Sequence, residues 1–174
     1  MKKLYLALAM LLISFNANAF IISPHVGIDY AHSKLHGFDN INELNGATFS
    51  VGAKALGFLS VEGYYQKHFS TKASASSKTK PSAYGVDLVF DTLNLGVVEL
   101  LTTVGYGKYS LDGGILDKDL NKFEGSSYRL GFGGQINPTD KIGIRAMYRY
   151  IFPEEKLFKK NVQELSIGIR YYFF

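Results

Sequence analysis

Strict alternation of apolar and polar residues organises the chain after residue 19. Alternation is the signal of a half-buried strand, because successive side chains of a strand point to opposite faces. We find no helical period that persists for three turns. Eight alternating stretches can be identified, over about 20–32, 47–55, 58–68, 82–91, 96–110, 127–136, 141–152 and 162–174. The pattern predicts an all-β chain of about eight strands.

Every stretch has one apolar face and one face of small and charged residues, with Leu101 as an exception in the fifth. The charged face holds five acids and five bases: Asp29, Lys54, Glu62, Asp87, Glu99, Arg129, Arg145, Arg149, Glu164 and Arg170. Ionised groups away from water persist only when they are paired, and four of these bases are arginines, whose planar fork can bind a carboxylate at two points. We interpret this face as a lumen ion-pair network enclosed by the strands. A solvated face of a soluble sandwich or barrel is the alternative.

The connections between the stretches alternate in length. Those over 33–46, 69–81, 111–126 and 153–161 are long and polar, whereas Leu56-Gly57 and a turn at 137–140 are short. Short turns on one rim and long loops on the other are typical of transmembrane barrels. A sheet in hydrocarbon also has to close, because all of its backbone polar groups need partners. We therefore predict a transmembrane antiparallel up-and-down β-barrel, with tyrosines and phenylalanines at the ends of its apolar faces forming interfacial girdles.

The first 19 residues have the composition of an export signal. Lys2 and Lys3 precede an apolar run over 4–15, and Ala17-Asn18-Ala19 supplies a small-x-small cleavage site. The run is shorter than the roughly 20 residues that a membrane-spanning helix needs. We expect residues 1–19 to be a cleavable signal peptide and residues 20–174 to form one barrel domain in the bacterial outer membrane.

Composition excludes several classes of protein. The absence of cysteine excludes disulfides, a thiol nucleophile and a lipidated N-terminal cysteine. Without Lys2 and Lys3, the 19 basic residues become 17 against 15 acidic ones, so the charge gives no argument for nucleic acid. A mean hydropathy of +0.01 excludes a helical membrane bundle, while 12 Tyr, 13 Phe and 18 Gly favour sheet.

The last ten residues alternate and end in aromatics, Tyr171, Phe173 and Phe174. This segment resembles the C-terminal insertion signal of outer-membrane barrels, although Phe173 is in phase with the apolar face and Phe174 is one residue extra. With the other seven stretches, nearly the whole mature chain resembles the eight-stranded barrels typified by the transmembrane domain of outer membrane protein A and by outer membrane protein X. The resemblance implies contact with outer-membrane lipids and the insertion machinery. Members of that family stabilise the envelope, act as adhesins or serum-resistance factors through their loops, or modify lipid A.

Candidate catalytic chemistry is sparse. His68-Phe69-Ser70 is similar to the His-x-Ser pair of lipid A deacylases, and a spacing of two places both side chains on one face of a strand. The residues over 71–73 do not continue that motif, and the pair is expected to begin a long loop. The four histidines do not have metal-ligand spacing. We expect no catalytic set, no metal and no cofactor.

The loops provide the second hypothesis. Lys72, Lys78 and Lys80 form a basic loop without acidic neighbours, which is suited to lipopolysaccharide phosphates or to acidic glycans of a host surface or matrix. Plain solvated lysines are the alternative. We therefore predict a monomeric barrel with a structural or surface-interaction role, and retain a lipid A deacylase and a small low-conductance pore as alternatives.

Overall fold

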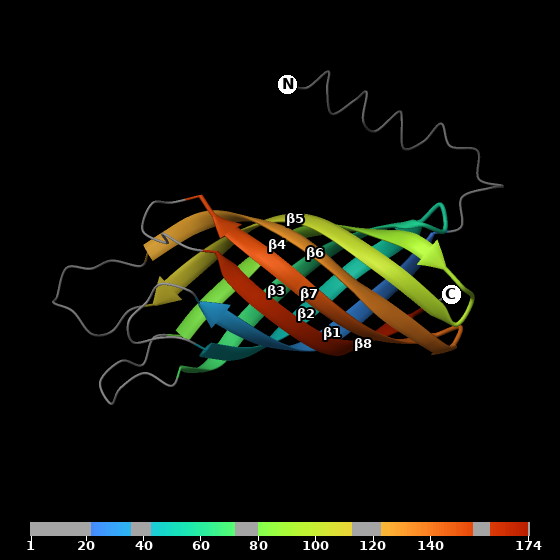
Figure 1. Ribbon diagram of the computed structural model, residues 1–174, viewed down its shortest axis with the longest axis horizontal. Helices are drawn as coiled ribbons and strands as arrows, with labels where there is room; N and C mark the ends of the chain where they lie inside the picture. Colours follow the sequence, from blue (N-terminus) through green and yellow to red (C-terminus); the bar gives the residue numbers. More distant parts are fainter. Residues whose placement is uncertain (1–21, 36–42, 72–79, 113–122, 155–160, 174) are drawn as a thin grey trace, which may run out of the picture.

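The computed structural model describes residues 22–35, 43–71, 80–112, 123–154 and 161–173. They form one closed barrel in which each strand pairs with the next and the last pairs with the first, all antiparallel (Figure 1). The strands are β1 (Ser23–Leu35), β2 (Glu43–Ala55), β3 (Leu59–Thr71), β4 (Lys80–Asn94), β5 (Val98–Asp112), β6 (Phe123–Thr139), β7 (Ile142–Pro153) and β8 (Val162–Tyr172). The predicted fold class and strand number are confirmed. No helix in these residues is long and apolar enough to cross a membrane.

The apolar faces point outward on every strand. Ile28 on β1 and Phe132 on β6 are 60% and 63% exposed, whereas Asp29, one residue further along, is 2% exposed. A soluble monomer rarely exposes more than a few hundred Å² of contiguous apolar surface. Strands of 11 to 17 residues also reach or exceed the roughly 9–11 residues that a tilted strand needs to cross a bilayer. The outward band therefore has the character and the length of a lipid-facing surface.

Short and long connections lie at opposite ends of the barrel, as the sequence predicted. Only three residues separate β2 from β3 and β4 from β5, and two separate β6 from β7. Leu56, Gly57 and Gly96 take positive φ angles of 56°, 72° and 83°, which these tight reversals require. The strand ends that lead into the four long connections gather at the left of Figure 1. By analogy with other transmembrane barrels, we call this the outer end and the other the short-turn end.

The strands run further toward the outer end than the alternation predicted. β3 continues to Thr71 and β6 begins at Phe123, so the connections shorten to 36–42, 72–79, 113–122 and 154–161. Polar residues such as Lys67 enter the outward face there and the apolar Leu44 points inward, so the binary pattern is lost while backbone pairing such as Lys34 with Glu43 continues. The expected turn over 137–140 is also corrected: β6 pairs through Thr139 after a register shift, and the turn lies at 140–141.

Leu101, the exception in the sequence pattern, lies inside the barrel. It is 2% exposed and packs with Val89 and Met147, which also occupy inward positions. These three residues come from β4, β5 and β7. A small apolar cluster therefore interrupts the charged interior, and the deviation in the pattern reflects packing of inward side chains on neighbouring strands, with Gly133 between Leu101 and Met147.

Candidate functional site

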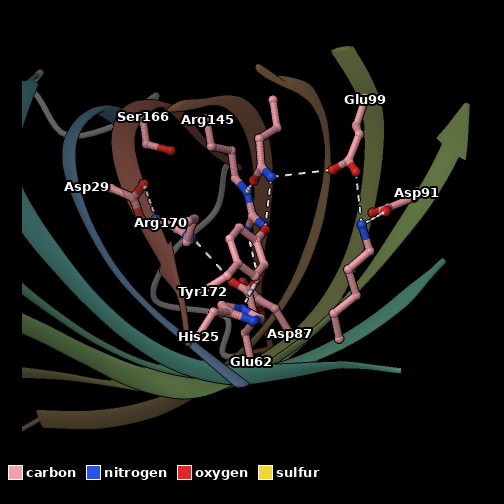
Figure 2. Close-up of polar contacts among 12 residues, drawn as sticks. His25, Asp29, Glu62, Asp87, Asp91, Glu99, Arg145, Ser166, Arg170 and Tyr172 are labelled. Atoms are coloured by element: carbon pink, nitrogen blue, oxygen red, sulfur yellow. Dashed lines mark hydrogen bonds and ion pairs between the residues drawn. The ribbon is translucent and has the colours of Figure 1, made fainter. Parts of the chain in front are cut away.

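The centre of the lumen is organised around the buried carboxylate of Glu62 on β3. Its Oε1 accepts a hydrogen bond from Arg145 NH1 at 2.7 Å and lies 3.0 Å from Nε2 of His25. The guanidinium of Arg170 approaches the other oxygen at 3.9 Å. Figure 2 shows these side chains converging from different strands on one region of the interior. Charges this deeply buried are stable only because each finds an opposite partner.

Arg170 of β8 is held mainly by Asp29 of β1. NH1 and NH2 donate to the two carboxylate oxygens at 2.9 Å each, so the pair is bidentate (Figure 2). Glycines make room for it: a Cβ on Gly27 would collide with the Arg170 side chain, and one on Gly168 would collide with Asp29. The glycines that alternate with charges on the inward face thus accommodate large neighbours in a narrow lumen.

A second carboxylate, Glu164 of β8, organises the outer half of the lumen. It accepts hydrogen bonds from Gln66 at 2.6 Å, from Arg149 at 3.2 Å and from Ser33 at 3.2 Å. Arg129 lies 3.6 Å from Glu164 and 3.5 Å from Asp87, with its guanidinium carbon 3.9 Å from the centre of the Tyr64 ring. That stacking is a cation–π contact, which contributes most where water is excluded.

A third group lies toward the short-turn end. Lys54 forms ion pairs with Asp91 and, at 2.9 Å, with Glu99 (Figure 2). Gln135 joins this group to the centre, because it donates to Glu99 at 3.3 Å and accepts from Arg145 at 2.9 Å. All ten charged residues assigned to the lumen from the sequence therefore point inward and form ion pairs or hydrogen bonds with one another or with polar neighbours.

Several members of the network were not identified from the sequence. They are His25, Gln66, Asp91, Gln135 and Tyr172, and each has a hydrogen bond or ion pair within the lumen. Four of them, His25, Gln66, Gln135 and Tyr172, occupy inward positions in the alternation of their strands. Their position in the alternation was therefore the signal in the sequence that could have identified them. Asp91 has the same signal, because it follows the inward Asp87 and Val89 at steps of two along β4, at the end of the predicted fourth strand.

Two cavities flank the central network. The outer cavity has a volume of about 90 Å³ and is bounded by residues such as Leu44, Ile151 and Glu164; a wider mouth of about 870 Å³ opens at the short-turn end beside Lys54. Asp29, Glu62, Arg145 and Arg170 line neither cavity and lie between them along the strands. Ion pairs and hydrogen bonds among these four side chains therefore cross the middle of the lumen.

The candidate deacylase pair lies in a strand and not at the start of a loop, which corrects the expectation from the sequence. His68 is buried, and its Nδ1 lies 3.2 Å from the carbonyl oxygen of Pro81, to which it donates. Ser70 pairs with Asn45 on β2, and its side chain is outside the described residues. Within the described residues, no group of three or more His, Asp or Glu side chains could hold a metal ion.

The proposed insertion signal and basic loop are described only in part. Tyr171 and Phe173 point outward with ring centres 5.3 Å apart, and Phe173 N donates to Pro24 O at 3.0 Å. Phe174, Lys72, Lys78 and the signal peptide over 1–19 lie outside the described residues, as does the side chain of Lys80. Their roles remain predictions from the sequence.

Comparisons with known proteins agree with this architecture. Neisserial surface protein A is similar over 86% of this chain and 96% of its own, with a TM-score of 0.69 and 14% identity. The N-terminal β-barrel domain of Pseudomonas aeruginosa OprF is similar over 86% of this chain and 97% of its own, with a TM-score of 0.63 and 13% identity. Ail, the attachment invasion locus protein of Yersinia pestis, is similar over 87% of this chain and 97% of its own, with a TM-score of 0.55 and 21% identity.

Sequence comparison is decisive for the family. No curated protein matches the chain significantly. Residues 5–173, however, match the profile of the outer membrane protein beta-barrel domain, which is nearly the whole sequence. The chain belongs to the outer membrane protein beta-barrel domain family and is a small eight-stranded barrel of the bacterial outer membrane.

Proposed function

We propose that this protein is a closed, non-conducting barrel that contacts molecules at the cell surface through its long outer connections. The observation that supports it most directly is the side-chain network across the lumen, where Glu62 of β3 pairs with both Arg145 of β7 and Arg170 of β8. A passage for solutes needs open, wetted space through the middle. A barrel whose interior is occupied by side chains can instead serve as a rigid scaffold that positions loops for binding.

Some proteins of similar structure have names that refer to the cell surface or to attachment. One is named as an attachment invasion locus protein and another as a surface protein, and the former has been solved with the heparin analogue sucrose octasulfate. Structural similarity at 14% and 21% sequence identity shows a shared fold and not a shared function. The proposal that this chain binds a sulfated glycan therefore rests on its own basic loop, Lys72, Lys78 and Lys80.

Binding of fluorescent heparin to cells that display the protein tests this role. Changing Lys72, Lys78 and Lys80 to Ser should reduce binding by about fivefold per lysine, given roughly 1 kcal/mol per basic residue near an anionic surface. Lys141→Ser is the matched control, because Lys141 is exposed in a turn at the opposite end. Equal binding by the triple variant and the control would exclude the basic loop as the glycan site.

The pore alternative predicts current steps in planar lipid bilayers. We expect none from the folded protein, because the ion-pair network occupies the middle of the lumen. Discrete, reproducible steps that disappear when the protein is unfolded would overturn the closed-barrel proposal.

The deacylase alternative depends on Ser70 acting beside His68. We expect Ser70→Ala to leave the lipid A acylation pattern of the host cell unchanged when the protein is expressed. Loss of one acyl chain in cells with the unaltered protein, restored in the Ser70→Ala variant, would establish the enzyme instead.

A further inference from the structure

The outer cavity is lined differently from the centre of the lumen. Its walls include apolar side chains at inward positions of β2, β4, β7 and β8: Leu44, Pro81, Ala83, Ile151, Pro153 and Val162. At the centre, inward positions carry the charges of the ion-pair network instead. A concave apolar surface with a few polar groups is the usual character of a site for a small molecule.

Aromatic rings leave the cavity open, because they lie along its walls over glycines. A Cβ added to Gly46 would lie 3.2 Å from Cδ2 of His68, and one on Gly125 would collide with the ring of Tyr109. The resulting space has a volume of about 90 Å³. A water molecule needs about 10–15 Å³ of such space, so the cavity can hold a molecule of about six to nine non-hydrogen atoms.

One buried polar atom of the cavity wall lacks a partner. His68 is 8% exposed, and its Nδ1 donates to the carbonyl oxygen of Pro81, so the neutral ring has its lone pair on Nε2. Among the residues that the structure describes, none forms a hydrogen bond with this Nε2. A buried acceptor without a donor is unfavourable, so a molecule in the cavity that donates to Nε2 is stabilised there.

The charged groups beside the cavity favour an uncharged ligand. Arg129 and Glu164 both border it and are almost completely buried. Arg129 faces both Asp87 and Glu164. Glu164 in turn faces Arg149, so two positive charges meet two negative ones. An additional charge in the cavity would be left without an opposite partner, which is costly away from water.

We propose that the outer cavity is a binding site for a small, uncharged molecule with an apolar body and one hydroxyl group, of the size of a phenol or a short alcohol. The hydroxyl group donates to Nε2 of His68, and the apolar body contacts side chains such as Leu44 and Ile151. A ligand that enters from the outer end does not have to cross the central network, so the site is compatible with a closed barrel. The proposal goes beyond the surface-interaction role and does not involve the basic loop.

The probe is 4-fluorophenol, titrated at neutral pH into the purified protein in lipid nanodiscs and followed by fluorine NMR, with empty nanodiscs to correct for partition into lipid. Its methyl ether, 4-fluoroanisole, is the matched ligand, because it has the same ring but cannot donate a hydrogen bond. His68→Phe should lower the ratio of phenol to ether affinity about fivefold, the effect of one neutral hydrogen bond. His32→Phe is the control and should leave the ratio unchanged, because His32 bonds to Asn45 and does not border the cavity. With nitrogen-15 in the histidine rings, the phenol should also shift the Nε2 signal of His68.

Filling the cavity tests its place in the barrel. Ala83→Leu should weaken binding of the phenol by about tenfold or more, because the larger side chain occupies the space of the ligand. Ala146→Leu is the matched control, since Ala146 is exposed on the outward face of β7, and should change binding by less than about twofold. Migration of the unheated protein on a detergent gel verifies that each variant is folded.

Three results would each overturn the proposal: no saturable binding beyond that of empty nanodiscs, an Ala83→Leu variant that binds like Ala146→Leu, or a ratio of phenol to ether affinity that His68→Phe leaves unchanged. 4-Fluorobenzoate tests the charge argument and should bind more weakly than the phenol; tighter binding of this anion would contradict an uncharged ligand. None of these variants changes a lysine of the basic loop. Heparin binding and the cavity site therefore fail separately.

Discussion

Neutralising Glu62 while keeping its shape tests whether charge pairing holds the barrel interior together. Glu62→Gln retains the size of the side chain but removes the charge that faces Arg145 at 2.7 Å and His25 at 3.0 Å. Arg145 then keeps its hydrogen bond to Gln135 and can donate to the amide oxygen of the new side chain, but no carboxylate contacts it directly, because Asp29 is already engaged by Arg170. The variant therefore leaves a buried guanidinium without an opposite charge beside it.

The expected loss of unfolding free energy is about 3–5 kcal/mol, the usual cost of breaking a buried ion pair from one side. Removing both charges, with Glu62→Gln and Arg145→Gln together, should recover much of that loss, since no unpaired ion remains. Glu43→Gln serves as the control, because Glu43 is exposed and pairs with Lys34 at the outer end. An exposed pair contributes only about 0–1 kcal/mol.

Unfolding by urea in lipid vesicles measures these differences, with circular dichroism and gel mobility as the readouts because the chain has no tryptophan. The order of stability should be unaltered protein and Glu43→Gln first, the double variant next and Glu62→Gln last. If Glu62→Gln is within about 0.5 kcal/mol of the control, water and not Glu62 stabilises Arg145, and the filled-lumen argument is wrong.

Three other predictions follow from packing and processing. Gly168→Ala should destabilise the barrel by at least about 1–3 kcal/mol, because the added Cβ would collide with Asp29 and with backbone. Gly134→Ala should be tolerated, since the nearest atom to its new Cβ is 3.5 Å away; gel mobility after heating compares the two. Leu101→Ala should lower the free energy of unfolding by about 2–5 kcal/mol in urea titrations, and no change would mean that the apolar cluster is not close-packed. N-terminal sequencing of the protein from outer membranes should begin at Phe20, and a start elsewhere would refute cleavage after residue 19.

Alternation along the chain was sufficient to predict the strands and their faces. The period of two is a local property of an extended backbone, so each stretch reveals by itself which side is apolar. The same reasoning placed Asp29, Glu62 and Arg170 on the inward face before any partner was known. It ended the third strand at His68, three residues too early, because polar and apolar residues no longer separate cleanly between the faces there and backbone pairing leaves no trace in residue type.

Only the closed structure decided which charges meet. Asp29 and Arg170 are 141 residues apart and become neighbours because β1 pairs with β8 when the sheet closes. Leu101 could be interpreted only as an exception until its inward packing with Val89 and Met147 was visible. Strand order and register set these contacts, and they depend on the whole sheet. The sequence by itself therefore determined a barrel with a charged interior and a lipid-facing exterior, and the tertiary structure determined how that interior is filled.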